Sequence, residues 1–152
     1  MELLKKVGAK IKTTNSDIFI KGPRKIKSIK NIKTKEFPGI PTDLQAQLMV
    51  LMCKSNEKSS ITESIFENRF MHVAELQRLG AKINVVNNKA YIKGNTKFIG
   101  AELISSDLRA SVALVLAAMV AKGKSIVGRV YHLERGYENI ENKLQKIGVK
   151  IK

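Results

Sequence analysis

The pattern of apolar and polar residues repeats in the same order at three places along the chain. At each place, apolar residues at helical spacing lead to a glycine, and a short alternating stretch follows. Glycine adopts positive φ without a steric clash and so commonly ends a helix, while alternation is typical of a strand. The pattern therefore predicts a helix joined to a strand at residues 3–11, 75–83 and 143–151.

The similarity extends beyond these junctions. A turn rich in Asn, Ser and Asp separates two short apolar runs at residues 11–21 and again at residues 83–93. Because such residues favour tight turns, both segments are predicted hairpins. An apolar helix is then predicted in each copy, at residues 45–53 and 109–121.

A hydroxyl residue followed by an aspartate precedes each predicted apolar helix. Thr42 and Asp43 occupy this position before the first helix, and Ser106 and Asp107 before the second. A side-chain oxygen can accept a hydrogen bond from the first free N–H groups of a helix, and a carboxylate in the first turn is favoured by the helix dipole. We therefore expect Thr42 and Ser106 to be N-caps, with the aspartates in the first turn.

These elements form a repeating unit of strand, helix, strand, helix, strand, strand. Strands are predicted after the two apolar helices, and one unit occupies residues 24–94. A second occupies residues 95–152 and ends on the first strand of a closing hairpin, while residues 1–23 are the end of a truncated unit. The period is too long for a short-repeat solenoid. The chain is predicted to be one incomplete α/β domain, 1–152, in which three units could close around one core.

The composition excludes several classes of protein. Hydrophobic residues make up 43% of the chain, which predicts a packed core. No apolar run approaches the roughly 20 residues that span a bilayer. The single cysteine, Cys53, excludes an internal disulfide, favours a reducing cytoplasm and is expected to be a buried, unreactive thiol. His72, at a predicted helix start, and His132, in a predicted loop, lack further ligands at metal-binding spacing, so no metal site is expected.

The formal net charge of +15 has two interpretations. It could indicate a polyanionic partner such as RNA, or it could reflect a lysine-rich surface without a ligand. Lysines are scattered and far outnumber arginines, whereas bidentate recognition of phosphate or bases favours arginine. We favour the second interpretation, and the basic stretch at residues 21–35 is expected to be an irregular edge strand with a solvated face.

Four motifs occur in order along the chain. They are FPGIPTDLQAQ at residues 37–47, TESIFENRFMH at 62–72, SDLRAS at 106–111 and YHLERGYE at 131–138. Together they resemble the UDP-N-acetylglucosamine 1-carboxyvinyltransferases, the UDP-N-acetylglucosamine enolpyruvyl transferases. The resemblance implies an inside-out α/β barrel of the enolpyruvyl transferase type, built from repeated βαβαββ units. It also implies transfer of the enolpyruvyl group of phosphoenolpyruvate to the 3-hydroxyl of UDP-N-acetylglucosamine, without a metal or organic cofactor. This reaction is the first committed step of peptidoglycan synthesis, which serves cell wall biogenesis, cell shape and cell division.

The resemblance suggests roles for residues of the first two motifs. Asp43 matches an aspartate near the sugar 3-hydroxyl, where a base is needed because an unassisted hydroxyl is a poor nucleophile. Its alternative role is to stabilise a helix start. Ile65 matches a residue, more often valine, that contacts the nucleotide-sugar, and it could equally be a core residue at a strand end.

The remaining candidates are charged residues. Arg135 matches an arginine that binds phosphoenolpyruvate, since a guanidinium can grip a carboxylate bidentately. Arg69 lies in the equivalent loop of the preceding unit and is a similar candidate. For both, the alternative is a surface ion pair with a neighbouring glutamate. Asp107 and Arg109 lie in a motif that the family uses at its cleft, where they could orient Arg135, or they could serve only as a helix cap and an exposed charge.

In the family, a second domain supplies the reactive cysteine, basic residues for the phosphate and much of the uridine pocket. This chain resembles only the C-terminal part of the family enzyme, so both substrates are expected to bind jointly with the missing domain. The chain alone is expected to lack transferase activity, because one cleft wall cannot hold two substrates in register. A membrane or nucleic-acid partner is not expected, but the truncated unit could cause self-association at a sheet edge. The alternative is a free-standing basic module of this fold that binds an anionic partner such as RNA.

Overall fold

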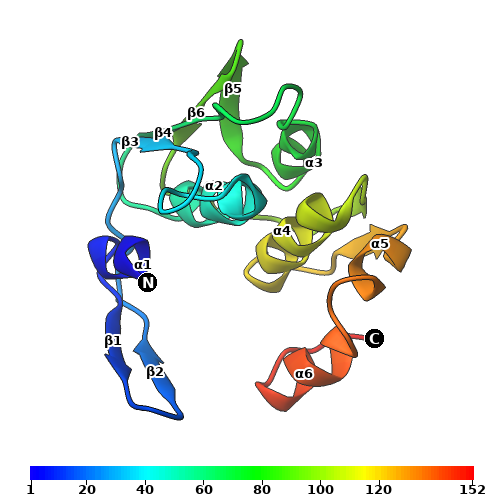
Figure 1. Ribbon diagram of the computed structural model, residues 1–152. Coiled ribbons are helices and arrows are strands. Elements are labelled where there is room, and N and C mark those ends of the chain that lie inside the picture. The colour runs from blue at the N-terminus through cyan, green and yellow to red at the C-terminus, as the bar shows by residue number, and fades with distance from the viewer.

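The computed structural model describes all 152 residues as a series of short helices and strands (Figure 1). The first half of the chain contains α1 (Glu2–Lys6), β1 (Lys10–Thr13), β2 (Ile18–Lys21), β3 (Asn31–Lys33), a 3₁₀ turn (Thr42–Leu44), α2 (Gln45–Cys53), β4 (Ser59–Thr62) and α3 (His72–Arg78). The second half contains β5 (Lys82–Val86), β6 (Lys89–Lys93), β7 (Glu102–Ile104), α4 (Leu108–Met119), β8 (Ile126–Gly128), α5 (Tyr131–Glu134) and α6 (Ile140–Lys146).

The strands form one four-stranded sheet and two pairs. In the larger sheet the order is β3-β4-β6-β5, with β3 parallel to β4 and the other neighbours antiparallel. The pair β7–β8 is parallel, like β3–β4, and the hairpin β1–β2 is antiparallel, like β5–β6. The two predicted hairpins are therefore present, and β3 lies at a sheet edge as expected from the basic stretch.

The elements from β3 to β6 follow the strand, helix, strand, helix, strand, strand order. After β7, α4 and β8, the extra short helix α5 contains His132, which was predicted to lie in a loop. Residues 149–152 were predicted to form a strand and do not, because no neighbouring strand pairs with them. One hydrogen bond of the β5 region is nevertheless repeated here. The side chain of Gln145 donates to the carbonyl of Ile151, as that of Gln77 donates to the carbonyl of Ile83.

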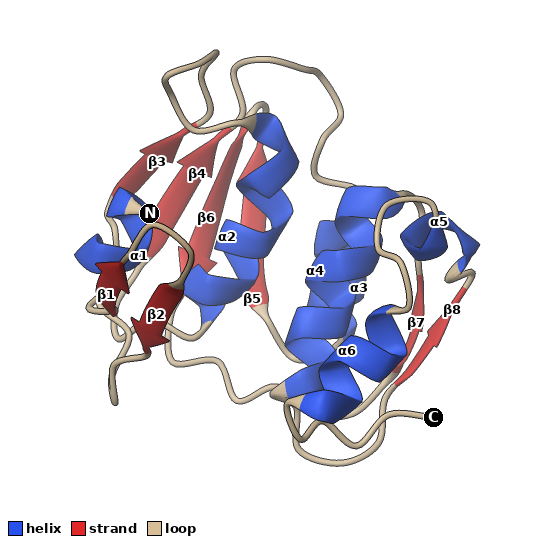
Figure 2. Ribbon diagram, turned by 60° about the horizontal axis from the view of Figure 1, so that its bottom comes forward, coloured by secondary structure: helices blue, strands red, loops and turns tan.

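The three central helices lie inside and the sheets outside. Figure 2 shows α2, α3 and α4 in the middle, with the four-stranded sheet on one side and the β7–β8 pair on the other. Helix α2 has little amphipathic character, and Met49, Met52 and Cys53 are fully buried in it. The inner face of α4 joins the same core, while Val112 and Val115 pack with Leu133 and Ile140 in a smaller cluster toward α5 and α6. This is the inside-out arrangement that the family resemblance implied.

Burial of the Cys53 side chain outweighs a hydrogen bond with Thr96, which acts to lower the pKa, and the pKa of the thiol is raised to about 12. The thiol is therefore protonated at neutral pH. A thiol needs ionisation and access to react, and Cys53 has neither. The prediction of an unreactive thiol agrees with this environment.

Candidate active site

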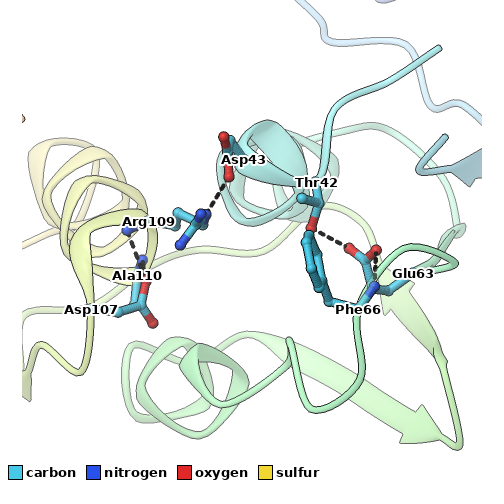
Figure 3. A network of polar contacts seen from close by, with 7 residues as sticks. All are labelled: Thr42, Asp43, Glu63, Phe66, Asp107, Arg109 and Ala110. Atoms are coloured by element: carbon cyan, nitrogen blue, oxygen red, sulfur yellow. Dashed lines mark hydrogen bonds and ion pairs between the residues drawn. The ribbon is translucent and has the colours of Figure 1, made fainter. Parts of the chain in front are cut away.

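The starts of α2 and α4 carry the charged residues that were singled out in the sequence. Asp43 lies in the 3₁₀ turn before α2, and Arg109 lies in the first turn of α4. The Nε–H of Arg109 donates to Oδ1 of Asp43, and this is the only ion pair in the structure (Figure 3). The side chains are 37% and 64% exposed, respectively, so the pair faces solvent and leaves Oδ2 of Asp43 without a protein donor. The fold thus joins two motifs that are 66 residues apart.

Asp107 is the N-cap of α4. Its Oδ1 accepts from the backbone N–H groups of Arg109 at 2.8 Å and Ala110 at 3.1 Å. Ser106 was predicted to be this cap, but its hydroxyl instead donates to Asp107 at 3.2 Å. Burial tends to raise the pKa of Asp107, but these hydrogen bonds and the charge of Arg109 outweigh burial and lower it. Asp107 is therefore ionised at neutral pH.

Thr42 is not an N-cap either. Helix α2 follows the 3₁₀ turn directly and has no side-chain cap. The N–H groups of Leu44 and Gln45 donate to the backbone carbonyls of Pro41 and Thr42, and the hydroxyl of Thr42 donates instead to Oε2 of Glu63 at 2.8 Å.

A cavity of about 280 Å³ lies where α2, α3 and α4 begin. Arg69, Asp107 and Arg109 line it, so three of the predicted charged residues share one pocket. The other lining residues are Thr42, Gln45, Ala46, Glu67, Asn68, Met71, His72 and Ala110. Asp43 reaches this pocket through its partner Arg109.

Among the lining residues that were not predicted as site residues, two are buried polar side chains, Gln45 and His72. Gln45 is 2% exposed and His72 is 5% exposed, and Nε2 of each has no hydrogen-bond partner. Burial lowers the pKa of His72 to about 4 and outweighs the nearby charge of Asp107, which acts to raise this pKa. The imidazole is therefore neutral at pH 7. Both residues lie in the quoted motifs, at the starts of α2 and α3, but the sequence does not show their burial beside a pocket, because this depends on how three helices meet.

Arg69 also borders a second, more open cavity of about 450 Å³ between its loop and the β5–β6 turn. Its guanidinium lies over the ring of Phe66, with 4.5 Å from Cζ to the ring centroid. The alternative interpretation, an ion pair between Arg69 and Glu67, does not form. A cation held on an aromatic face beside two cavities keeps its N–H donors available to a ligand.

The other two candidates lie apart from this cluster. Arg135 caps the C-terminal end of α5, is exposed, and lines neither cavity. It also forms no ion pair with Glu134. Ile65 is partly buried, and its backbone N–H donates to Glu63 at 2.9 Å. The structure therefore groups Asp43, Arg69, Asp107 and Arg109 and leaves Arg135 outside the group.

Glu63 is the most conspicuous residue that the sequence did not reveal. Its side chain is buried directly after β4, where it accepts hydrogen bonds from several segments (Figure 3). Glu63 lies in the second motif and immediately after a buried strand, but neither position indicated a role for it. No group of three or more His, Cys, Asp or Glu side chains is placed to hold a metal ion. None of the helices has the length and apolar character needed to cross a membrane.

Residues 1–144 match the family described as EPSP synthase (3-phosphoshikimate 1-carboxyvinyltransferase). The chain belongs to this family of carboxyvinyltransferases. Proteins named UDP-N-acetylglucosamine 1-carboxyvinyltransferase are similar to it over its whole length or nearly so. That of Pelagibacter ubique is 62% identical over 152 residues, and that of Geotalea uraniireducens is 51% identical over 148 residues.

Solved structures support the same fold. The enolpyruvyl transferase NikO from Streptomyces tendae matches with a TM-score of 0.91 and 26% identity, over 99% of this chain and 35% of that chain. EPSP synthase from Acinetobacter baumannii matches with a TM-score of 0.80 and 19% identity, over 99% of this chain and 38% of that chain, which shows the fold alone. The chain spans about a third of its relatives, 36% of the Pelagibacter ubique protein and 35% of the Geotalea uraniireducens protein.

Proposed function

We propose that this chain forms one wall of the active site of an enolpyruvyl transferase that uses phosphoenolpyruvate and UDP-N-acetylglucosamine. The observation that carries the proposal is the solvent-facing Asp43–Arg109 pair beside a pocket lined by Arg69 and Asp107. The names of the relatives at 62% and 51% identity support the choice of substrates. The second wall of the site is expected from the two thirds of those relatives that this chain does not cover.

In the proposed reaction, Asp43 accepts the proton of the sugar 3-hydroxyl. The hydroxyl oxygen forms a new bond to the enolpyruvyl carbon, and the bond from that carbon to the phosphate oxygen breaks, so that inorganic phosphate leaves. Oδ2 of Asp43 has no protein donor, which leaves it able to receive the proton while Arg109 holds Oδ1. General base catalysis of this kind contributes roughly 10²- to 10⁴-fold to a rate.

The other candidates are proposed to bind substrate. Arg69 and Arg135 offer guanidinium groups that no carboxylate of this chain neutralises, and such groups suit the carboxylate of phosphoenolpyruvate. Ile65 is proposed to contact the nucleotide-sugar, and it lies on the same loop as Arg69. Asp107 and Arg109 are proposed to shape the pocket, Asp107 by fixing the first turn of α4 and Arg109 by holding Asp43.

The place of the reaction in the cell is also a proposal. Transfer to this acceptor is the first committed step of peptidoglycan synthesis, which would connect the protein with cell wall biogenesis in the cytoplasm. We retain the division of the chain into residues 1–23, 24–94 and 95–152 as the proposed units of one incomplete domain. The strand pairs β1–β2 and β7–β8 each match half of the four-stranded sheet.

Open edges on these half-sheets support the proposal of self-association. Ile18, Phe19 and Ile20 of β2 are 61%, 62% and 55% exposed, and Ile126 of β8 is 48% exposed. Unpaired backbone groups beside exposed apolar side chains favour pairing with another chain. Sedimentation equilibrium across a concentration series would detect this association, and a monomer at every concentration would contradict it.

A chimeric enzyme tests the proposed function. This chain would replace the corresponding 36% of the Pelagibacter ubique relative, and phosphate release would be measured with both substrates. We expect activity that depends on UDP-N-acetylglucosamine and falls by at least about 10² in the Asp43→Asn variant, which keeps the side-chain shape. The isolated chain is expected to show no turnover.

The control is Asp17→Asn, which changes an exposed aspartate in the β1–β2 turn, far along the chain from the pocket. It should leave phosphate release unchanged. A folded chimera that releases no phosphate, beside an active relative, would contradict the proposal. Equal activity of Asp43→Asn and Asp17→Asn would contradict the role of Asp43.

A further inference from the structure

Glu63 is a buried carboxylate with no cationic partner. The residue is 2% exposed, and the only ion pair in the structure lies elsewhere. Its carboxylate accepts four hydrogen bonds, all from neutral donors, at 2.7 Å from Thr34, 2.8 Å from Thr42, 2.9 Å from the N–H of Ile65 and 3.3 Å from the N–H of Phe66. A buried charge is costly unless it is well hydrogen-bonded, and these four donors supply that stabilisation.

The balance of these effects keeps Glu63 ionised. Burial tends to raise the pKa of the carboxyl group, but the hydrogen bonds from Thr34, Ile65, Thr42 and Phe66 outweigh burial and lower it. The acceptor is thus a carboxylate near neutral pH, which makes the four bonds charge-assisted and stronger than those between neutral groups.

The donors come from three different segments of the chain. Thr34 follows β3, Thr42 belongs to the 3₁₀ turn that carries Asp43, and the two N–H groups begin the loop that leads to Arg69. The backbone of Glu63 is also tied to Asn88 in the β5–β6 turn, by bonds of 2.9 Å and 3.1 Å.

The two carboxylate oxygens of Glu63 accept hydrogen bonds from different donors. Oε2 accepts only from the hydroxyl of Thr42, and Oε1 accepts from Thr34 and both loop N–H groups. The Thr42–Glu63 bond is the only hydrogen bond between the turn at residues 41–44 and the loop at residues 62–71. One planar group therefore fixes the distance between the Asp43 turn and the Arg69 loop.

We propose that Glu63 is a positioning residue that holds the Asp43 turn and the Ile65–Arg69 loop in register across the cleft wall. The inference rests on the proposed function in treating this surface as the cleft wall. Glu63 touches neither substrate nor reacting atoms in this role. It acts through Thr42 on Asp43, and through the N–H groups of Ile65 and Phe66 on the loop.

Three substitutions separate this role from general stabilisation. Thr42→Val removes the hydroxyl that links the turn to Glu63 but keeps the side-chain shape. Thr42→Ser restores the hydroxyl. Thr96→Val is the control, because Thr96 also has a hydrogen-bonded hydroxyl away from the surface, and its partners, the carbonyl of Lys93 and the thiol of Cys53, lie away from the cleft wall.

The measurement is the Nε–Hε signal of Arg109 in a ¹H–¹⁵N spectrum of the full chain, since this group donates to Asp43. In Thr42→Val we expect this signal to move toward the position of a free arginine, together with the amide signals of Asp43 and Leu44. Thr42→Ser should return them, and Thr96→Val should leave them in place. An unmoved Arg109 signal in Thr42→Val, or the same movement in Thr96→Val, would overturn the inference.

Glu63→Gln provides a second test. The amide can replace Oε1 as an acceptor but presents an N–H₂ group to Thr42 in place of Oε2. We expect the Asp43 turn signals and the Ile65 and Phe66 amide signals to shift together, whereas a shift confined to one segment would contradict a shared anchor. If Glu63→Gln does not fold, the comparison between Thr42→Val and Thr42→Ser still tests whether the link to Glu63 positions the Asp43 turn.

Titration of the same samples with UDP-N-acetylglucosamine separates this inference from the proposed function. If the unmodified chain binds, Thr42→Val should weaken binding about tenfold, the factor expected for one lost charge-assisted hydrogen bond, and Thr42→Ser should restore it. Equal affinity of Thr42→Val and the unmodified chain would count against positioning. If the unmodified chain does not bind, as expected where the missing domain supplies much of the uridine pocket, the Arg109 signal alone tests the role of Glu63, and the chimera alone tests the proposed substrate.

Discussion

Replacement of Asp107 by alanine tests how the start of α4 is held. The substitution removes both hydrogen bonds that cap the helix, to the N–H groups of Arg109 and Ala110, and also a negative charge at the positive end of the helix dipole. Loss of an N-cap costs about 1 kcal/mol, and loss of the favourable charge about 0.3–1 kcal/mol. We expect the free energy of unfolding to fall by about 1.3–2 kcal/mol, and the Tm by about 5 °C for a chain of this size.

The matched variant Asp107→Asn keeps a capping oxygen and loses only the charge. It should therefore cost about 0.5 kcal/mol, the helix-dipole part alone. Urea unfolding at pH 7, followed by circular dichroism, measures both variants. A loss below about 0.5 kcal/mol in Asp107→Ala would refute the capping argument, because even the weakest caps contribute that much.

The cost of Asp107→Ala should also depend on pH. Because the folded-state pKa of Asp107 is lowered, its contribution is fully present above the unfolded value of about 3.9 and is lost as the pH falls through the folded-state value. The difference in the free energy of unfolding between the unmodified chain and Asp107→Ala should therefore be constant from pH 7 to about pH 5 and shrink in stronger acid. A difference that is equal at pH 7 and at pH 2.5 would show that the lost stability does not come from the ionised carboxylate.

Three further predictions concern single sites. The pKa of His72 is lowered from 6.5 to about 4 in the folded chain, so acid should destabilise the protein as the pH falls from 6.5 toward 4, and His72→Phe should remove this part of the urea pH profile. Gly94→Ala should destabilise the fold strongly, because the added Cβ would meet backbone carbonyl oxygens of the loop before β4, whereas the control Gly22→Ala has no atom within 4 Å and should be nearly neutral in thermal unfolding. Cys53 should react with a thiol reagent at least about a hundredfold more slowly in the folded chain than in urea, and equal rates would contradict its burial.

Local patterns predicted the elements that depend on local chemistry. The helix Gln45–Cys53 was predicted with the bounds found in the structure, because a continuous apolar run between polar flanks is a strong signal. The β1–β2 and β5–β6 hairpins were predicted from their turn residues. The repeat of these patterns also predicted the order of elements in a unit, and the family resemblance predicted the arrangement of helices inside and sheets outside.

Capping residues were predicted less well. Thr42 and Ser106 have the right chemistry for N-caps, but the first donates to Glu63 and the second to Asp107. The oxygen that caps a helix depends on the angle at which the chain enters the helix. A hydroxyl that donates to an acceptor elsewhere in the fold is no longer placed to act as a cap. His132, placed in a loop by its neighbours, lies in the short helix α5 because Leu133 packs beneath α4.

The candidate site was predicted in part. The family motifs pointed to Asp43, Arg69, Asp107 and Arg109, which the fold brings to the starts of α2 and α4 and to the loop between β4 and α3. Their roles, and those of Ile65 and Arg135, remain predictions. Glu63 lies in the second motif, but its role could not be predicted, because its partners Thr34 and Thr42 are 29 and 21 residues away and no periodic pattern indicates such bonds.

The single ion pair has a consequence for the response of the fold to salt. The chain carries 28 Lys and Arg side chains against 13 Asp and Glu side chains, yet only Asp43 and Arg109 form a pair. Added salt therefore has almost no attraction to screen and much repulsion, since the screening length falls from about 10 Å at 0.1 M to about 3 Å at 1 M. Sodium chloride should stabilise this protein by relieving the self-repulsion of its +15 net charge, and the free energy of unfolding should rise steadily from low to moderate ionic strength.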